Sequence, residues 1–212
     1  MRPACAGGDA ARMAWSTCFA VLYDPFLWLG EHAGMRRHRR ELLGRARGRV
    51  LEIGAGTGLN VPHYPAGLDE LILTEPDAAM SKRLRERSDG RASVVAASAD
   101  DLPLADASVD TVVSTFVLCT VEDPAATLRE IRRVLRPDGQ LLLIEHVRSD
   151  NRIGAWCQRR LRTPWSRFAC GCRCDQRTVE LLRTAGFHTE LRPARWRAMP
   201  PLVRPVVVGL AR

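Results

Sequence analysis

An apolar run that ends in three closely spaced glycines most limits how this chain can fold. The stretch VLEIGAGTGLN covers residues 50–60 and places glycines at positions 54, 56 and 58. The apolar run predicts a buried strand, and glycines directly after it predict a tight turn that brings the backbone close to a ligand. A strand, a glycine-rich turn and a helix are the first unit of a parallel α/β sheet.

Further short apolar runs recur along the chain, separated by stretches with helical periodicity. One such stretch starts at Asp123, which can cap a helix, and Pro124, which suits the first helical turn. Alternating strands and helices predict a Rossmann-like, doubly wound α/β fold, with a seven-stranded sheet that is mostly parallel and has an antiparallel last strand. The expected strands are residues 49–54, 70–75, 92–97, 109–116, 139–147, 187–194 and 204–212.

The length of 212 residues suits a single domain with a substantial core. Within that domain we expect four parts. They are a disordered tail (1–12), an N-terminal helical cap (13–48), a cofactor-binding core (49–147) and a substrate-side cap with the closing strands (148–212).

Two segments outside the core have less regular patterns. Residues 27–46 predict one amphipathic helix that packs across the sheet edge, whereas the alternation lapses over residues 148–174. A helix is then expected with Asp175 as its cap and Gly186 as its left-handed stop.

Charge and cysteine content exclude several classes of protein. The net charge is +8, yet residues 51–147 hold sixteen acidic and nine basic residues. The basic residues show no aromatic-interleaved pattern, so we expect no nucleic-acid partner. Seven cysteines without an export signal argue against a disulfide framework and favour a cytoplasmic protein. No apolar run reaches the roughly 20 residues that span a bilayer.

The residues around the glycines distinguish two kinds of cofactor. A dinucleotide fingerprint needs a third glycine at position 59, which is Leu59 here. Glu52 beside the turn disfavours a diphosphate and favours the sulfonium and ammonium groups of S-adenosylmethionine (SAM). Glu75 ends the second strand, where a carboxylate accepts hydrogen bonds from ribose hydroxyls. SAM is therefore favoured, and a nicotinamide cofactor remains the alternative.

Several motifs resemble those of known enzymes. The strings VLEIGAGTG, LTEPD, DLPLADASVDTVVSTFVLCTV and LREIRRVLRPDGQLLLIEHV resemble class I SAM-dependent methyltransferases, in particular the group with the ubiquinone/menaquinone-biosynthesis enzymes. Shorter strings, VLCTV, EHV, FACGCRCDQRT and LVRPVVVGLA, are similar to the membrane-associated alkyl-thiol S-methyltransferases of animals and their bacterial relatives. The resemblance implies SAM as cofactor and a small-molecule acceptor.

By position, the resemblance also implies which residues hold the cofactor. The glycines line the methionine part and Glu75 holds the ribose. Relatives place an acid directly after the third strand to accept the adenine amino group, but here Ser98 and Ala99 come first, so either Asp100 or Ser98 is expected to make that contact. The full set is Glu52, Gly54, Gly56, Gly58, Glu75, Pro76, Ser98, Ala99, Asp100 and Thr115.

The methyl acceptor is expected at the carboxyl ends of the fourth and fifth strands. Methyl transfer needs alignment and exclusion of water, and a base only where the acceptor loses a proton. His146 is the candidate base, or else a histidine hydrogen-bonded to backbone. Glu145 either orients His146 or faces the other side of the strand, and Cys119 lines the pocket. A lipophilic thiol is the first choice of acceptor. A quinone-precursor carbon, a phospholipid nitrogen and SAM binding without catalysis are the alternatives.

Two clusters outside the core leave alternatives open. Cys157, Cys170, Cys172 and Cys174 could hold zinc or arsenic, but their spacing differs from that of zinc sites, so we favour an ordinary loop with no metal. Aromatic residues at 156, 165, 168 and 196 suit a cap over an apolar substrate or ordinary packing.

The N-terminal region combines aromatic residues with an arginine cluster. We favour a helix that packs on the sheet with its arginines in water, and peripheral contact with an anionic membrane is the alternative. The aromatic residues are Trp15, Phe19, Phe26 and Trp28, and the arginines are Arg36, Arg37, Arg39 and Arg40.

Overall fold

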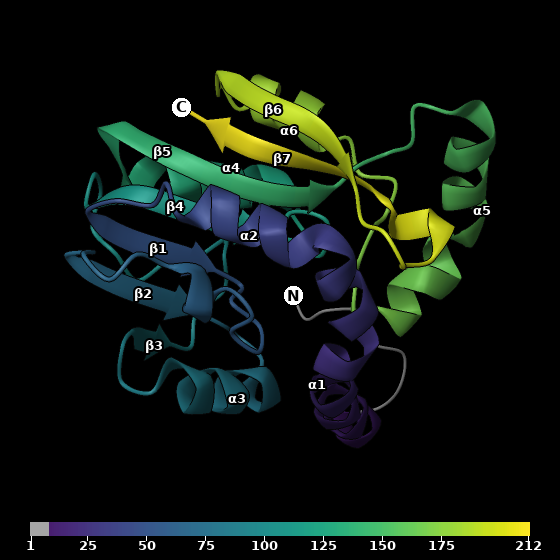
Figure 1. The fold of residues 1–212 in the computed structure, drawn as a ribbon, viewed down its shortest axis with the longest axis horizontal. Coiled ribbons are helices and arrows are strands. Elements are labelled where there is room, and N and C mark those ends of the chain that lie inside the picture. Colours follow the sequence, from purple (N-terminus) through teal and green to yellow (C-terminus); the bar gives the residue numbers. More distant parts are fainter. Residues whose placement is uncertain (1–8) are drawn as a thin grey trace.

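The computed structural model describes residues 9–212, with side chains from Thr17 onward, and within them lies the predicted sheet. Its strands are arranged in the order β3-β2-β1-β4-β5-β7-β6 (Figure 1). Strands β1 to β5 are parallel to one another, and β7 is antiparallel to both β5 and β6. The Rossmann-like prediction is confirmed. The strands are β1 (Arg49–Ile53), β2 (Glu70–Thr74), β3 (Ser93–Val95), β4 (Val109–Thr115), β5 (Leu135–His146), β6 (Thr189–Arg195) and β7 (Pro205–Ala211).

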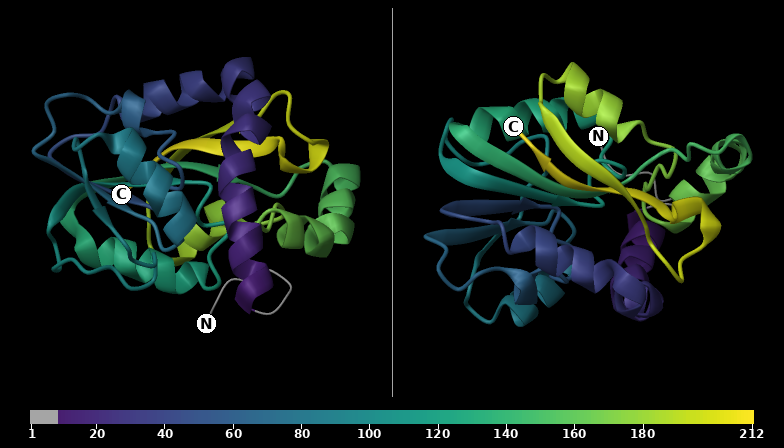
Figure 2. Two further views of the ribbon diagram at one scale, coloured as in Figure 1. Left: turned by 90° about the horizontal axis from the view of Figure 1, so that it is seen from below. Right: turned by 45° about the horizontal axis from the view of Figure 1, so that its top comes forward.

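Helices cover both faces of the sheet because neighbouring strand residues point to opposite sides. Figure 2 shows helices on both sides of the sheet. Val50 packs in one apolar core with Leu43 of α2 (Arg36–Leu43), and Leu51 packs in the other with Leu128 of α4 (Pro124–Val134). The described helices are α1 (Asp9–Gly30), α2 (Arg36–Leu43), α3 (Ala78–Ser88), α4 (Pro124–Val134), α5 (Arg152–Phe168) and α6 (Thr178–Thr184).

The predicted helix caps were right in one case and wrong in the other. Asp123 accepts hydrogen bonds from the backbone of Ala125 and Ala126 at 2.9 and 3.0 Å, as a cap does. Asp175 caps nothing, because α6 starts only at Thr178 and the Asp175 carboxylate lies 3.9 Å from Arg162 of α5. Gly186 follows α6 with φ +80°, the left-handed conformation expected of a helix stop.

The N-terminal region contains two helices where residues 27–46 predicted one. Helix α1 ends at Gly30, a π-helical turn covers Glu31–Met35, and α2 follows. The break lies at Gly34, whose φ of +137° is outside helical geometry and accessible to glycine. Of the expected tail, residues 1–8 lie outside the described residues, and α1 already begins at Asp9.

Helix α5 (Arg152–Phe168) lies within the segment 148–174, where the sequence pattern lapsed. Its cap is Asn151, whose side chain accepts from the backbone of Ile153 and Gly154 at 2.8 and 3.3 Å. Both α5 and α1 stand beyond the carboxyl ends of the parallel strands (Figure 1), the edge where α/β proteins bind ligands. No described helix is both long enough and apolar enough to cross a bilayer.

Candidate functional site

The glycine-rich turn after β1 opens onto a small cavity. Gly54, Gly56 and Gly58 all have positive φ, between +54° and +83°. A Cβ on Gly56 would meet nothing within 4 Å, whereas one on Gly58 would lie 2.9 Å from Leu84 of α3. Gly56 therefore leaves room for a ligand, and Gly58 allows close helix packing. The cavity is lined by Tyr23, Arg39, Glu52, Gly54, Ala55, Gly56, Thr57, Leu59, Asn60 and Thr115.

Two buried carboxylates flank this turn, and both have hydrogen-bond partners. Glu52 accepts from Asn60 Nδ2 at 2.7 Å and from the Tyr64 hydroxyl at 2.6 Å. Burial raises the pKa of Glu52 to about 7, although these two hydrogen bonds oppose the shift. Glu75 accepts from the backbone of Gly56 and Asp77 at 2.8 and 2.9 Å, so it ties the end of β2 to the turn.

A buried ion pair extends this network to α2. Arg39 is only 2% exposed, and its Nη2 lies 3.0 Å from Glu31 Oε1. Its Nη1 donates to Asn60 Oδ1 at 2.8 Å, and Asn60 in turn donates to Thr115 Oγ1 at 2.9 Å. The prediction that the whole arginine cluster faces water is thus wrong for Arg39, because the Glu31 carboxylate compensates its charge inside the protein. The neighbouring arginines at 36, 37 and 40 are exposed.

Helix α1 forms a wall of the cavity that the sequence did not predict. Asp24 accepts from the Thr57 hydroxyl at 2.6 Å and pairs with Arg87 of α3 at 2.5 Å. These contacts place Tyr23, one residue earlier, among the lining residues. Local sequence periodicity could not predict this contact, because Asp24 and Thr57 are 33 residues apart in the sequence.

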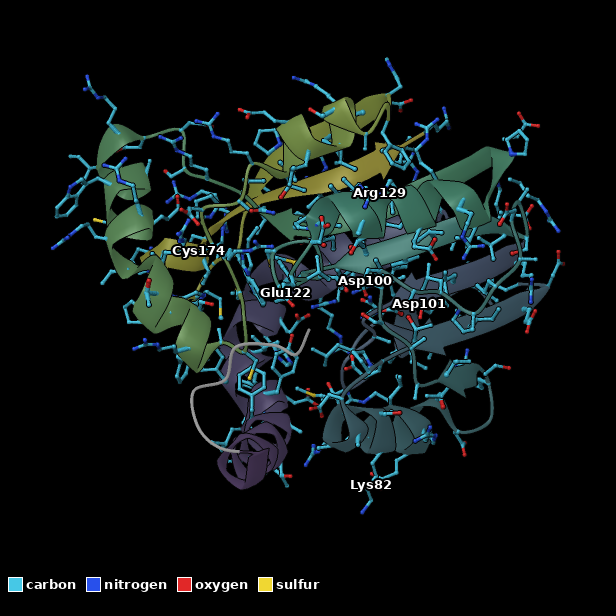
Figure 3. The ribbon with its side chains drawn as sticks, turned by 180° about the vertical axis from the view of Figure 1, so that it is seen from behind. Lys82, Asp100, Asp101, Glu122, Arg129 and Cys174 are labelled. Carbon is cyan, nitrogen blue, oxygen red and sulfur yellow. The ribbon has the colours of Figure 1, made fainter. Side chains whose placement is uncertain are left out.

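The residues expected near adenine and ribose lie at the ends of β2 and β3. Ser98 and Asp100 are exposed and hydrogen-bonded to each other, while Ala99 is buried. Pro76 is exposed after Glu75. Figure 3 shows Asp100 and Asp101 well apart from Cys174, which lies on the side of α5.

After Thr115 the chain enters a cluster of buried aromatic rings. Phe116 stacks on Trp196 with a centroid distance of 4.5 Å, and its ring lies 4.6 Å from that of His146. Phe116 has φ +61°, a conformation that a bulky residue adopts only under constraint from its surroundings. Burial lowers the pKa of His146 to about 4, so the imidazole is neutral at physiological pH. Its Nδ1 has no hydrogen-bond partner among the described residues.

Glu145 faces the other side of β5 from His146, as strand alternation predicts. Its Oε1 accepts from Ser114 Oγ at 2.7 Å and from the backbone of Val117 and Leu118 at 2.9 and 3.0 Å. Burial raises its pKa to about 7. Glu145 thus supports the loop after β4 from within and is fully buried, as is Cys119.

The cysteine-rich segment after α5 contacts the same loop. The Sγ atoms of Cys172 and Cys119 lie 3.8 Å apart. Cys174 is buried, which raises the pKa of its thiol to about 12. In the part of the chain that the structure describes, no three histidine, cysteine or acidic side chains gather in a way that could hold a metal ion.

Comparison with known proteins assigns these features to an enzyme class. A family model described as a methyltransferase domain matches residues 51–143. A solved SAM-dependent methyltransferase from Thermotoga maritima, a possible histamine N-methyltransferase, has a similar fold, with 23% identity, a TM-score of 0.68, and coverage of 93% of this chain and 96% of that one. Together with the glycine turn at the carboxyl edge of the sheet, these matches define a SAM-dependent methyltransferase.

Curated relatives narrow the class further. The thiol S-methyltransferase TMT1B of Homo sapiens is 34% identical over 192 residues, covering 82% of this chain and 76% of that protein. The ubiquinone/menaquinone biosynthesis C-methyltransferase UbiE of Shewanella sp. (strain W3-18-1) is 33% identical over 133 residues, covering 58% of this chain and 53% of that protein. This chain belongs to the methyltransferase family that contains the thiol S-methyltransferases TMT1A and TMT1B.

Proposed function

We propose that this enzyme transfers the methyl group of SAM to the sulfur of a small, lipophilic thiol. The observation that carries the proposal is the neutral imidazole of His146, which has an unpartnered Nδ1 and lies against the rings of Phe116 and Trp196. Apolar rings around one unpaired nitrogen suit an apolar molecule with one weak hydrogen-bond donor, as a thiol is. The likeness to thiol S-methyltransferases supports the same acceptor.

The residues of the cavity fit the cofactor. An open space at Gly56, a buried carboxylate at Glu52 and a buried guanidinium at Arg39 would receive the zwitterionic methionine part, with Thr115 beside it. Glu75 would hold the ribose if its hydrogen bond to Gly56 is exchanged for one to a hydroxyl. On the adenine side, Ser98 and Asp100 remain the proposed contacts, with Ala99 and Pro76 lining it.

We assign His146 the role of proton acceptor. Bound SAM supplies an electrophilic methyl group on a sulfonium. As the acceptor sulfur bonds to carbon, its own S–H proton becomes strongly acidic, so a base with a low pKa suffices to take it. The imidazole is neutral at physiological pH, because burial lowers its pKa more than backbone groups of Val203 and Pro205 raise it, and Nδ1 has no hydrogen-bond partner among the described residues. Cys119 and Glu145 would act through the shape of the loop after β4, since both are fully buried.

The acceptor is tested with matched compounds that differ only at the accepting atom. An alkyl thiol, the corresponding primary amine and a quinol are incubated with labelled SAM, and the methylated products are identified by mass spectrometry. We expect kcat/KM for the thiol to exceed that for the amine by at least about 100-fold. The amine is protonated, and the rings of Phe116, His146 and Trp196 offer it no carboxylate with which to pair. Preferential methylation of the quinol carbon or of a phospholipid amine would reject the proposal.

We also propose peripheral contact with an anionic membrane, made by α1 and α5. Phe26 of α1 contacts Phe168 of α5, with a centroid distance of 5.9 Å, so the two helices share one exposed face. Helix α5 has five arginines and no acidic residue, which complements anionic head groups. The exposed apolar side chains of these two helices are Val21, Leu22, Phe26, Trp28, Leu29, Ile153, Trp156, Leu161 and Phe168.

Vesicle co-sedimentation tests this contact. The full chain should bind vesicles containing phosphatidylserine, bind weakly to neutral vesicles, and lose binding when Trp28 and Trp156 are both replaced by Ser. The matched control is Arg37→Ser, on the exposed side of α2 and outside the proposed face. Equal binding to neutral and anionic vesicles would contradict an electrostatic contribution from the arginines of α5. Unchanged binding in the double variant would contradict membrane contact through α1 and α5.

A further inference from the structure

Two buried thiols meet where the loop after β4 contacts the segment after α5. Cys119 lies three residues after Phe116, on the loop that follows β4. Cys172 belongs to the loop after α5, 53 residues further along the chain. Their Sγ atoms are 3.8 Å apart, and the residues are 0% and 6% exposed.

Backbone contacts fix this approach. The N–H of Arg173 donates to the carbonyl of Cys119 at 2.7 Å, and the Arg173 guanidinium donates to the carbonyl of Val121. Gly171 has φ +98°, and a Cβ there would lie 3.1 Å from the carbonyl oxygen of Thr120. These contacts therefore hold the two segments side by side before any disulfide joins them. A disulfide needs sulfurs about 2 Å apart, so each side chain has to move by only about 1 Å.

The two thiols differ in reactivity. The hydrogen bond that Cys172 shares with Cys119 and the Arg173 charge lower the pKa of Cys172, although burial opposes the shift. The pKa of Cys119 is raised by that same hydrogen bond and by burial. Cys172 thus has more thiolate character and is the less deeply buried of the pair.

We propose that Cys119 and Cys172 form a disulfide when the enzyme meets a hydroperoxide, and that this bond slows methyl transfer. The Cys172 thiolate attacks the peroxide, the O–O bond breaks, and one oxygen leaves as water after protonation while Cys172 becomes a sulfenic acid. The Cys119 sulfur attacks the Cys172 sulfur, the second oxygen leaves as water, and the S–S bond forms. Overall, two thiols and one peroxide give one disulfide and two water molecules.

The effect on activity follows from the position of Cys119. Closing the disulfide shifts the loop that contains Phe116 and also Val117, whose N–H donates to Glu145. This movement alters the contact between the rings of Phe116 and His146. The cross-link also joins the loop to the segment after α5, which restricts any movement between them. This inference uses the methyltransferase class only and does not depend on a thiol being the acceptor.

Peroxide treatment of the reduced enzyme tests the proposal. After removal of thiols, hydrogen peroxide is added in slight excess, free thiols are alkylated, and peptides are mapped by mass spectrometry. We expect a peptide pair joined through Cys119 and Cys172, a Tm raised by several degrees, and a methyl-transfer rate reduced at least about fivefold. A phosphine reductant should reverse all three. The cross-linked fraction is measured again after each assay, because a thiol acceptor can also reduce the bond.

Matched variants decide the outcome. Cys172→Ala and Cys119→Ala should remove both the cross-link and the reversible loss of rate, whereas Cys174→Ala, in the same segment, should keep both. The proposal is overturned if peroxide joins other cysteines but not this pair. It is equally overturned if Cys172→Ala loses activity reversibly to the same extent as the unmodified sequence.

Discussion

The two sides of the site differ in how their polar groups are paired. Around the glycine turn, Glu52, Glu75 and Arg39 are buried, and each has two or more hydrogen-bond partners. Most of the buried side-chain polar atoms that have no hydrogen-bond partner lie on the other side, toward α5. Among the described residues these atoms are Glu145 Oε2, His146 Nδ1, Trp165 Nε1 and Trp196 Nε1, with Ser81 Oγ of α3 as the exception.

This difference in hydrogen-bond pairing affects what each side of the site can bind. A fully paired network is rigid and holds one cofactor in one place, because every buried charge or dipole is already fixed. Unpaired atoms in an apolar wall cost free energy that a ligand can recover by pairing with them. The proposed function assigns the cofactor to the paired side and a second molecule, which enters and leaves, to the aromatic side.

The largest expected effect comes from breaking the paired side at Arg39. Arg39→Leu leaves the Glu31 carboxylate buried without its partner, and the free energy of unfolding should fall by about 3–5 kcal/mol in urea titrations. Replacing both Glu31 and Arg39 by Leu should recover a large part of that loss. A loss below about 1 kcal/mol in the single variant would contradict the description of this side as a compensated network.

The next effect concerns Glu145, which lies beneath the loop after β4, and it depends on pH. The folded-state pKa of Glu145 is raised to about 7 from the ordinary 4.5. Between these values the folded chain keeps a proton that the unfolded chain has lost, so this group's contribution to stability falls as pH rises.

Glu145→Gln removes that titration. The stability of the variant relative to the parent should therefore increase by about 3 kcal/mol between pH 4.5 and 7.5. Glu52, whose pKa is also raised, is present in both proteins and cancels in the difference. Parallel stability curves would show that Glu145 is ionised in the folded protein throughout this range.

Cofactor binding can be removed at a single glycine. Gly56→Val forces a branched side chain into a left-handed conformation and into the cavity, and the Kd for SAM should rise at least about 100-fold by calorimetry. Gly90→Val is the matched control, since Gly90 also has positive φ and open space but lies between α3 and β3. Equal weakening in both variants would mean that backbone strain, and not the cavity, is responsible.

A smaller effect is expected where α1 closes the cavity. Asp24→Ala removes the contacts to Thr57 and Arg87, and the Kd for SAM should rise about three- to tenfold, the range for one or two lost hydrogen bonds. Glu41→Ala, which removes an exposed ion pair with Arg37 on α2, should leave it unchanged. An unaltered Kd in Asp24→Ala would remove α1 from the cofactor site.

The sequence predicted the paired side better than the aromatic side, for a physical reason. The strand with its glycines, the carboxylates at 52 and 75 and the Asp123 cap are local patterns within a few residues. The stack of Phe116, His146 and Trp196 joins residues up to 80 positions apart, and nothing local marks them as neighbours. Helix α5 was missed because its apolar residues are mostly exposed, so it has no buried stripe.

The measurement that tests the account most directly is the pH dependence of methyl transfer in His146→Phe, a substitution that keeps an aromatic ring in the stack and removes the nitrogen acceptor. SAM should bind with unchanged Kd. Below the pKa of the thiol, the rate of the variant should fall tenfold per pH unit, because only thiolate from solution can react, while the rate of the parent falls less steeply. Identical profiles, or a loss of SAM affinity as large as in Gly56→Val, would contradict the division of the site into a cofactor side and an acceptor side.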